Sequence, residues 1–202
     1  MINIDNISKE ADKPFQILKD LYEAAIKNKQ SSVEAIVISS IGPNASYSDA
    51  RFVNLKYITD NSLIFFTNYE SNKANHFNAY KDSMITSAIY WDSIDTQIRI
   101  RGPIEKCSEE FSDKHFLNRD KNKNAIAISS KQSQKIENYD AVLKKYKEIL
   151  EGNSLMKRPS YWGGYKIKPI FFEFWQANEY RINKREVYEK DGNNWVNYFL
   201  QP

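Results

Sequence analysis

Residues 51–67 read RFVNLKYITDNSLIFFT, two runs of β-branched and aromatic residues separated by a polar stretch. Runs of this composition are typical of β-strands, and Asp60-Asn61 between them is typical of a turn. We therefore predict an antiparallel hairpin with strands over residues 51–58 and 63–67.

Similar strand patterns occur on both sides of this hairpin. They lie at residues 35–40, 84–91, 96–106, 165–175, 187–188 and 195–200. Helical patterns occur after Asp12 and Pro14 to about residue 29, from Ser71 to about Tyr80, and within residues 108–152. Many short strands with few helices predict a mainly β, α+β fold, in which an antiparallel barrel is closed so that no strand edge is exposed. With no repeat or low-complexity linker, we expect one domain over residues 1–202.

Composition excludes several classes of function. The chain has 29 Lys and Arg against 26 Asp and Glu, a net charge of +3, which is too small to indicate nucleic-acid binding. Cys107 is the single cysteine and His76 and His115 are the two histidines, so a disulfide is excluded within the chain and a metal site is not expected. No signal peptide and no apolar run of about 20 residues is visible, which predicts a cytoplasmic protein without membrane contact.

No conventional catalytic motif is present. The chain lacks a glycine-rich phosphate loop and a Gly-x-Ser-x-Gly nucleophile elbow, and neither histidine stands in a metal-binding pattern. Such a chain either binds a ligand without chemistry or takes its chemistry from a cofactor.

Several polar residues nevertheless stand where a ligand could use them. Gln97, Arg99 and Arg101 alternate with isoleucine, so they share one face of a strand, which is either a binding face or a solvated one. Asn72-Lys73 at a helix start could hold an anion or simply face water. The same alternatives apply to Gln132-Ser133 and to the pair Arg181 and Arg185, while composition alone would place the aromatic segments 162–165 and 173–176 in the core.

Taken together, these segments resemble the pyridoxamine 5′-phosphate oxidase family, from about Asp12 to Pro202. Any one segment is a weak signal, but they occur in family order. The matching segments are residues 51–56 (RFVNLK), 66–68 (FTN), 71–74 (SNKA), 97–102 (QIRIRG), 131–133 (KQS) with Ile136, 162–165 (WGGY), 173–176 (EFWQ), 181–185 (RINKR) and Leu200 with Pro202.

The resemblance implies an FMN-binding split β-barrel of antiparallel Greek-key type that works as a homodimer. Two FMN sites would lie between the subunits, and the part from about residue 160 to 202 would complete the site and the dimer. The implied reaction is oxidation of pyridoxamine or pyridoxine 5′-phosphate to pyridoxal 5′-phosphate, with molecular oxygen as electron acceptor and hydrogen peroxide as product.

The resemblance also implies roles for particular residues. The FMN phosphate would be held by Arg51, Lys73 and Ser133, with Gln132 alongside. The whole implied FMN site is Arg51, Val53, Asn54, Lys56, Phe66, Thr67, Asn72, Lys73, Gln97, Arg99, Gln132, Ser133, Trp175 and Arg185. The implied substrate site is Lys56, His115, Arg119, Lys123, Arg181 and Asn183, of which Arg181 and Asn183 would be catalytic.

The chain departs from the family pattern mainly among the residues for substrate. His115 replaces a tyrosine, Lys123 a serine and Asn183 a histidine, while Asp120 replaces a proline. Asn72 replaces an arginine beside the FMN phosphate. Three alternatives remain: an FMN oxidase of the same fold with another substrate, such as a phenazine-type compound; a split-barrel protein that binds flavin or haem without turnover; and a purely structural dimer, which would purify colourless.

Overall fold

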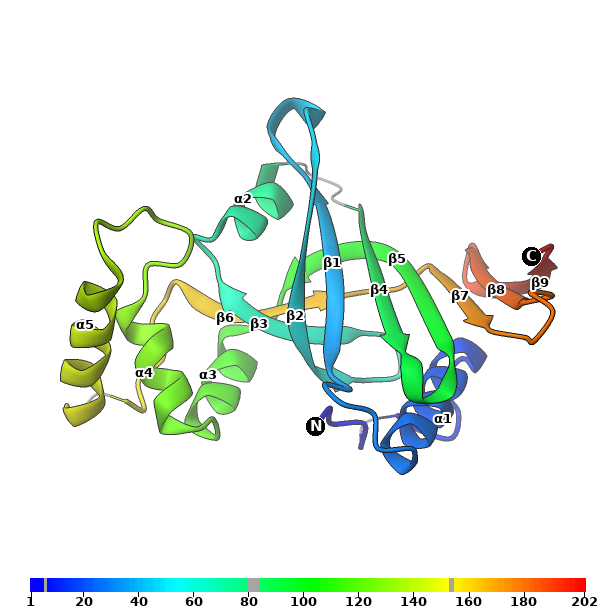
Figure 1. The fold of residues 1–202 in the computed structure, drawn as a ribbon, viewed down its shortest axis with the longest axis horizontal. Coiled ribbons are helices and arrows are strands. Elements are labelled where there is room, and N and C mark those ends of the chain that lie inside the picture. The colour runs from blue at the N-terminus through cyan, green and yellow to red at the C-terminus, as the bar shows by residue number, and fades with distance from the viewer. Residues whose placement is uncertain (6, 80–83, 153–154) are drawn as a thin grey trace.

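The computed structural model describes residues 1–5, 7–79, 84–152 and 155–202. Six strands form a closed barrel in the order β4-β1-β2-β3-β6-β5, and β5 pairs back onto β4 (Figure 1). All six neighbouring strands run antiparallel. Their bounds are β1 Ala35–Ile41, β2 Ser48–Ile58, β3 Leu63–Asn68, β4 Met84–Trp91, β5 Thr96–Lys106 and β6 Trp162–Ile167. The predicted split-barrel fold is thereby confirmed.

Strand β5 belongs both to the barrel and to the sheet that extends beyond it. Along one edge it pairs with β4, and along the other edge its two halves have different partners. Its first half pairs with β7 (Phe171–Gln176) and its end pairs with β6. At the crossing, a Cβ on Gly102 would lie 2.2 Å from the carbonyl oxygen of Lys168, so only glycine allows the two backbones to come this close. Strands β8 (Lys184–Asp191) and β9 (Asn194–Leu200) then continue the sheet beyond β7.

The hairpin predicted from residues 51–67 is present as β2 and β3. The register shifts between Leu55 and Tyr57, so Lys56 is the extra residue of a β-bulge. The single strand predicted for residues 165–175 is wrong, because the chain leaves β6 after Ile167 and re-forms a strand as β7 only at Phe171.

Five helices flank the strands in the described part of the chain. They are α1 Lys13–Lys27, α2 Asn72–Ala79, α3 Glu109–Leu117, α4 Lys121–Ser129 and α5 Tyr139–Glu151. The predicted end of α2 at Tyr80 lies outside the described residues. The region predicted as helical over residues 108–152 is three helices with a non-helical segment ahead of α5.

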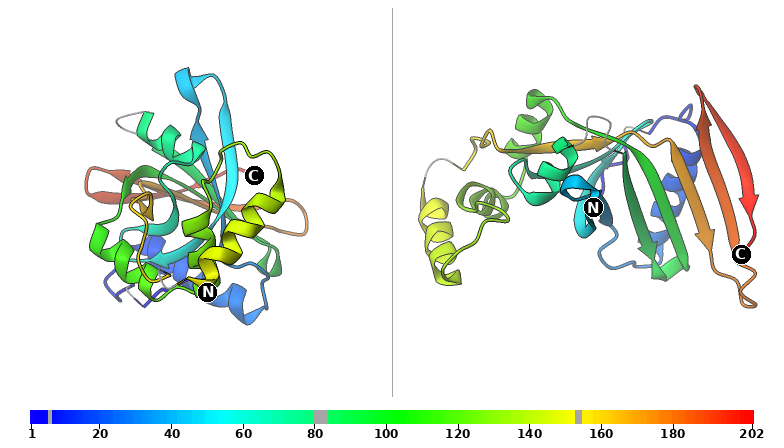
Figure 2. Two further views of the ribbon diagram at one scale, coloured as in Figure 1. Left: turned by 90° about the vertical axis from the view of Figure 1, so that its left-hand side faces the viewer. Right: turned by 90° about the horizontal axis from the view of Figure 1, so that it is seen from above.

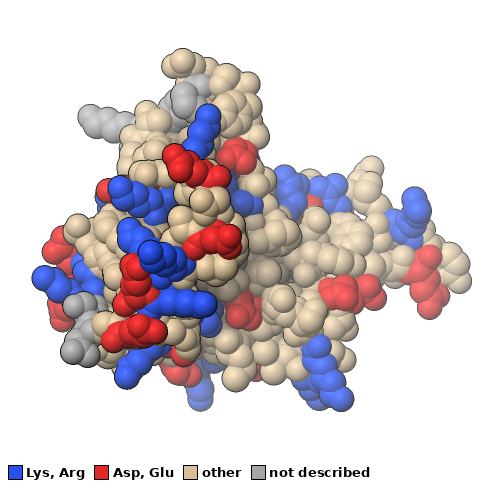
Figure 3. All heavy atoms as spheres, turned by 60° about the vertical axis from the view of Figure 1, so that its left-hand side comes forward, with Lys and Arg blue, Asp and Glu red and all other residues tan. Residues whose placement is uncertain are grey.

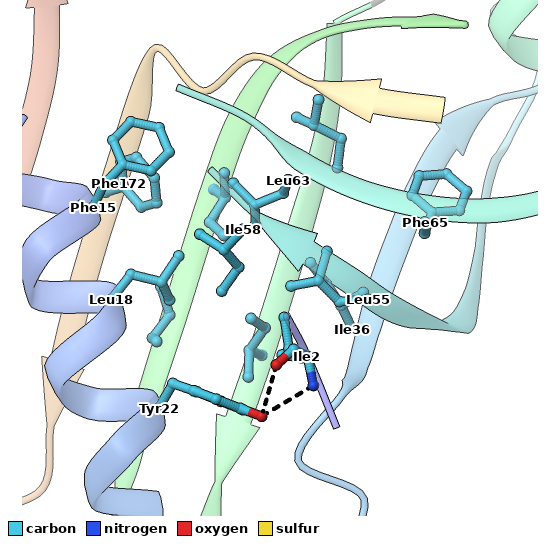
Figure 4. Packing of buried hydrophobic residues seen from close by; sticks show 14 of the residues in the cluster. Ile2, Phe15, Leu18, Tyr22, Ile36, Leu55, Ile58, Leu63, Phe65 and Phe172 are labelled. Carbon is cyan, nitrogen blue, oxygen red and sulfur yellow. Dashed lines mark hydrogen bonds between the residues drawn. The ribbon is translucent and has the colours of Figure 1, made fainter. Parts of the chain in front are cut away.

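Helix α1 closes one mouth of the barrel and carries much of the core. Phe15, Leu18 and Tyr22 lie on one face and are buried, and Phe15 meets Phe172 edge to face at 5.2 Å (Figure 4). The Tyr22 hydroxyl bonds the backbone of Ile2 in both directions. Asp12 occupies the helix N-cap position as predicted, but its carboxylate accepts from the Trp195 indole instead of capping the helix.

The elements are distributed along a long axis. Helices α3–α5 lie at one end, the barrel lies in the middle, and strands β7–β9 lie at the other end (Figures 1 and 2). Among the described residues, no helix combines the length and apolar character that crossing a bilayer requires. This arrangement matters for the site, because its predicted residues fall at both ends.

Candidate functional site

A cavity of about 680 Å³ opens between strands β2 and β3 and helices α2–α4. Most of the predicted site residues of the first 133 positions line it. Its lining residues are Asp49, Arg51, Phe52, Val53, Asn54, Lys56, Phe66, Thr67, Asn68, Asn72, Lys73, His115, Arg119, Lys123, Ile126, Ala127, Ser130, Gln132, Ser133 and Trp162.

Lys73 gives one end of the cavity a buried positive charge. Its side chain is only 6% exposed, and its ammonium donates to the hydroxyls of Thr67 at 3.0 Å and Ser71 at 3.1 Å. Within the described residues no carboxylate lies at ion-pair distance from it. Burial, with Arg51 nearby, lowers the Lys73 pKa to about 8. A desolvated ammonium held only by hydroxyls favours an anionic ligand.

Arg51 lies at the same end and is held in place by its own strand pair. Its guanidinium donates to the Ser40 hydroxyl at 2.7 Å and to the Ile38 carbonyl at 3.4 Å, and it forms an ion pair with Asp49. We call Arg51 and Lys73 the phosphate end, since two adjacent cations of this kind suit a phosphate group.

The loop before α5 supplies neutral groups to the phosphate end. The Gln132 side chain lies 3.4 Å from the Thr67 hydroxyl, and the Ser133 hydroxyl accepts from the backbone N–H of Asn72 at 3.5 Å. Ser133 adopts a left-handed φ of 71°. Residues 132–133 and 72–73, which were predicted to serve one site, lie next to each other in the cavity.

A second cationic group lies in the same cavity. Lys56, Arg119 and Lys123 are close enough for their charges to interact, and the repulsion from Lys123 and Arg119 adds to burial in lowering the Lys56 pKa. Glu34 offsets part of this charge from 3.7 Å. We call Lys56, Arg119 and Lys123 the triple-cation end.

His115 completes the triple-cation end as a neutral group. Its ring stacks on Phe66 with centroids 3.6 Å apart and rings 8° from parallel, and its Nδ1 lies 2.9 Å from the Tyr57 hydroxyl. Burial, together with the charges of Arg119 and Lys56, lowers the His115 pKa to about 4. A neutral ring bonded through Nδ1 to the Tyr57 hydroxyl carries its proton on Nε2 when that hydroxyl donates.

The Trp162-Gly163-Gly164-Tyr165 segment is buried and supports the cavity wall. The Trp162 ring lines the cavity, stacks on Phe66 at 5.3 Å and receives the Arg119 guanidinium at 4.9 Å. A Cβ on Gly163 would lie 2.1 Å from the Tyr69 hydroxyl, so a side chain at this position would displace that tyrosine. The segment therefore has a packing role beside its contact with the cavity.

Six predicted site residues do not line the cavity. Gln97 and Arg99 lie on β5, Trp175 on β7, Arg185 on β8, and Arg181 and Asn183 in the turn between β7 and β8. Strands β7 and β8 form the opposite end of the molecule from helices α3–α5 (Figure 1). One copy of the chain does not bring these residues to the cavity.

A buried carboxylate holds two of these six residues. Glu173 is 2% exposed and accepts from Arg99 and Arg185, each at 2.8 Å. The two guanidiniums are thus partly neutralised by the protein itself, unlike the ammonium of Lys73. Composition predicted that the segment 173–176 belongs to the core. The sequence gave no signal that Glu173 on β7 would pair with Arg99 on β5 and Arg185 on β8.

The turn before β8 is held by its own polar contacts. The Asn183 side chain accepts from the backbone N–H of Asn178 at 3.1 Å, and Arg181 has a left-handed φ of 59°. Arg181 is exposed. The side chain of Asn183 is therefore engaged within its own turn in a single chain.

Some cavity residues were not predicted from the sequence. Asp49, Asn68 and Ser130 line the cavity, and Tyr57 and Ser71 contact residues that do. Tyr57 follows the bulge residue Lys56, and this bulge could have marked it. A bulge is defined by strand pairing, however, so the sequence alone does not show it. Asp49 lies two residues before Arg51, where a carboxylate beside a cation resembles any surface ion pair.

Comparison with known proteins identifies the family. A model described as pyridoxamine 5′-phosphate oxidase matches residues 22–151, and one described as the pyridoxine 5′-phosphate oxidase C-terminal dimerisation region matches residues 162–202. The chain belongs to the pyridoxamine 5′-phosphate oxidase family. The resemblance found in the sequence is confirmed.

Individual relatives of this family cover nearly the whole chain. A pyridoxine/pyridoxamine 5′-phosphate oxidase from Colwellia psychrerythraea is 36% identical over 94% of this chain and 87% of its own length. Among solved structures, PhzG from Burkholderia lata in complex with tetrahydrophenazine-1-carboxylic acid has a TM-score of 0.87 at 26% identity, covering 96% and 95% of the two chains. A related FMN-binding protein from Nostoc punctiforme has the same fold at 11% identity, with a TM-score of 0.74 over 91% and 96%.

Family membership makes the chain a flavoprotein oxidoreductase with FMN as its cofactor. The residues of the cavity fit this cofactor, because the phosphate end offers two cations and several hydroxyls to a phosphate monoester. The match to a dimerisation region over residues 162–202 supports homodimer formation. On the face shown in Figure 3, basic and acidic side chains are intermixed.

Proposed function

We propose that the chain oxidises pyridoxamine 5′-phosphate and pyridoxine 5′-phosphate to pyridoxal 5′-phosphate, with molecular oxygen as the final electron acceptor. The name of the 36% identical relative supports this substrate class. The observation that carries the proposal is that the cavity has a cationic group at each of two places. One such group suffices for the phosphate of FMN, and the second remains for a phosphorylated substrate.

In this proposal the phosphate end binds the cofactor. Lys73 and Arg51 contact the FMN phosphate through charge-assisted hydrogen bonds, with Ser133, Gln132 and Asn72 around it. Thr67, Phe66 and the strand segment from Val53 to Asn54 lie along the wall between the two ends. This wall is where the flavin ring and its ribityl chain would lie.

The triple-cation end binds the substrate phosphate. Lys56, Arg119 and Lys123 attract the dianion, and His115 donates a neutral hydrogen bond from Nε2. Lysine at position 123 replaces a serine of the family pattern, and it contributes a full charge where the serine would contribute a hydroxyl. The substitutions at this end therefore change how the phosphate is bound but keep an anion site.

Bound FMN would supply a hydride acceptor for the substrate carbon that bears the amine or hydroxyl, with oxygen as the final oxidant reduced to hydrogen peroxide; for the amine, water then hydrolyses the imine to the aldehyde and ammonia. The chain's own residues fix the substrate against the cofactor, which lowers the entropic part of the barrier. Arg181 and Asn183 are proposed to contact the substrate ring on the side away from the flavin.

We further propose that each site is shared by two copies of the chain. The cavity of one subunit would be completed by residues from about 160 to 202 of the other, including Trp175, Arg181 and Arg185, together with Gln97 and Arg99 on β5. Two observations support this: strands β7 and β8 lie at the opposite end of the molecule from helices α3–α5, and the matched dimerisation region begins at residue 162.

Turnover with defined substrates tests the proposal. Pyridoxamine 5′-phosphate should be oxidised with release of one peroxide per aldehyde, and pyridoxamine without phosphate should be a far poorer substrate because the triple-cation end has nothing to bind. If the flavin stays oxidised when the phosphorylated compound is added without oxygen, the proposed substrate is wrong.

A phenazine-type substrate is a second candidate. It is supported by the TM-score of 0.87 to PhzG, a protein solved with a tetrahydrophenazine carboxylic acid, and by the family departures at His115, Lys123 and Asn183. Such a compound carries one carboxylate, which is a weaker match for three cations than a phosphate dianion. Rapid flavin reduction by a dihydrophenazine carboxylate, with none by pyridoxamine 5′-phosphate, would favour this candidate.

A further inference from the structure

A buried polar chain runs from Arg51 into the interior behind the phosphate end. The Arg51 guanidinium donates to the Ser40 hydroxyl at 2.7 Å, and the same hydroxyl lies 3.1 Å from Nδ1 of His76. Ser40 is 5% exposed and His76 is 6% exposed. Neither residue lines the cavity, and neither belongs to a segment that carries the family resemblance.

Arg51 fixes the direction of the first hydrogen bond. A guanidinium N–H can only donate, so the Ser40 oxygen accepts from Arg51. The hydroxyl keeps its own proton and a second lone pair, so it donates to Nδ1 in one tautomer of His76 and accepts from it in the other. In both cases the contact with His76 fixes the orientation of the hydroxyl that Arg51 contacts.

Helix α2 links this chain to the other phosphate-end cation. Lys73 and His76 are three residues apart, so they lie on the same face of the helix, and both are buried. Through His76 the helix is attached to β1 at Ser40, and through Lys73 it reaches β3 at Thr67. The relative position of the two cations therefore depends on His76.

We propose that His76, acting through Ser40, is a positioning residue that fixes the Arg51 guanidinium for the FMN phosphate. The inference rests on the proposed placement of that phosphate at Arg51 and Lys73. Asp49 binds one terminal nitrogen of Arg51, and without Ser40 the other terminal nitrogen would keep only the long 3.4 Å contact to the Ile38 carbonyl. The Ser40 contact restrains the other terminal nitrogen.

The test compares FMN with riboflavin, which lacks the phosphate, as ligands of the full-length chain after removal of its flavin. His76→Leu removes the ring nitrogen and introduces an apolar side chain, Ser40→Ala removes the middle of the hydrogen-bond chain, and His76→Asn retains a hydrogen-bonding atom close to the position of Nδ1. Lys73→Met serves as a reference for direct loss of a phosphate contact.

We expect His76→Leu and Ser40→Ala each to raise the dissociation constant for FMN about tenfold and that for riboflavin less than about twofold. The double variant should be no worse than either single one, because both changes break the same chain. His76→Asn should restore most of the FMN affinity.

Equal weakening of FMN and riboflavin would mean that His76 only supports the fold, and unchanged FMN binding would also overturn the inference. If His76→Leu does not fold, Ser40→Ala tests the selective loss of FMN affinity, and His76→Asn tests whether a polar side chain at position 76 preserves that affinity. Lys73→Met shows whether the inference about His76 or the proposed position of the FMN phosphate is at fault. If that variant weakens the binding of FMN and riboflavin equally, the phosphate does not lie at Arg51 and Lys73.

Discussion

The cavity and the sheet formed by β5 and β7–β9, which we call the C-terminal sheet, differ in whether the protein itself neutralises a buried charge. In the cavity, the Lys73 ammonium is buried against hydroxyls only, whereas Arg99 and Arg185 at the C-terminal sheet share the buried carboxylate of Glu173. A buried cation without a carboxylate is unfavourable until an anion binds, whereas the buried Glu173 carboxylate is compensated within the fold by two partly exposed guanidiniums. The difference indicates that Lys73 is reserved for a ligand and that Glu173 holds two arginines in position.

Glu173→Ala should have the largest effect on stability. It leaves two guanidiniums facing a vacated buried position, and we expect a loss of about 3 kcal/mol in the free energy of unfolding. Urea denaturation measures it. Glu105→Ala is the matched control, because Glu105 has 48% of its side chain exposed and pairs with Lys166 and Lys168 near the surface, and its loss should cost less than about 1 kcal/mol. Similar effects of the two substitutions would remove the contrast between the regions.

Lys73→Met should show the opposite pattern. Stability of the flavin-free chain should be unchanged or higher, because a buried charge is removed, while FMN affinity should fall about thirtyfold through loss of a charge-assisted contact. Equilibrium titration and urea denaturation measure the two quantities. A large loss of stability in the flavin-free variant would show that Lys73 supports the fold itself.

The pH dependence of FMN binding should report the same lysine. In the flavin-free chain the Lys73 pKa is lowered to about 8, so the ammonium loses its proton as pH rises through that value and FMN binds less tightly. Because the folded pKa lies below the ordinary 10.5, the folded chain without flavin should gain stability between about pH 8 and 10.5. Lys73→Met should abolish both trends, and their persistence would assign them to another group.

His115→Phe should have a smaller effect, confined to the substrate. It keeps the stack on Phe66 and removes one hydrogen bond, so KM for pyridoxamine 5′-phosphate should rise about fivefold with FMN affinity unchanged. His115→Tyr keeps a donor and should stay near the parent. Since the His115 pKa is lowered to about 4, the ring is neutral throughout pH 5 to 8, and a step in KM near pH 6.5 that disappears in the phenylalanine variant would contradict this.

Asn183→His should have the smallest effect. The substitution restores the family residue but removes the bond that the Asn183 side chain accepts from the Asn178 N–H, so we expect turnover to change by no more than about twofold. A large gain in turnover with the phosphorylated substrate would show that asparagine lowers activity at this position.

Much of the fold follows from local patterns in the sequence. The strands at residues 84–91 and 96–106 have the predicted bounds, because alternation and turn residues are properties of neighbouring positions. The break between β6 and β7 was not predicted. It depends on the crossing of β5 at Gly102, which is a contact between segments more than 60 residues apart.

Site residues could be predicted where a short segment matches the family pattern. They could not be predicted where a residue's role depends on contacts with residues far away in the sequence. Arg51, Lys73 and Ser133 could be named from their segments, and the structure brings them to one cavity. The roles of Glu173, Ser40 and His76 arise from contacts across strands and a helix, and no spacing along the chain marks them. Arg99 and Arg185 look like ligand-binding cations in the sequence, but each is first bound to Glu173.

Co-expression of two differently tagged variants would show whether the two regions form one site across a dimer. Lys73→Met impairs the cavity and Arg181→Gly impairs the C-terminal part, with glycine chosen to suit the φ of 59°. Each homodimer should turn over poorly. If sites are shared, the heterodimer has one site with no substitution, and the co-expressed mixture should recover about a quarter of the parental turnover per site. No recovery in purified heterodimers would contradict a shared site.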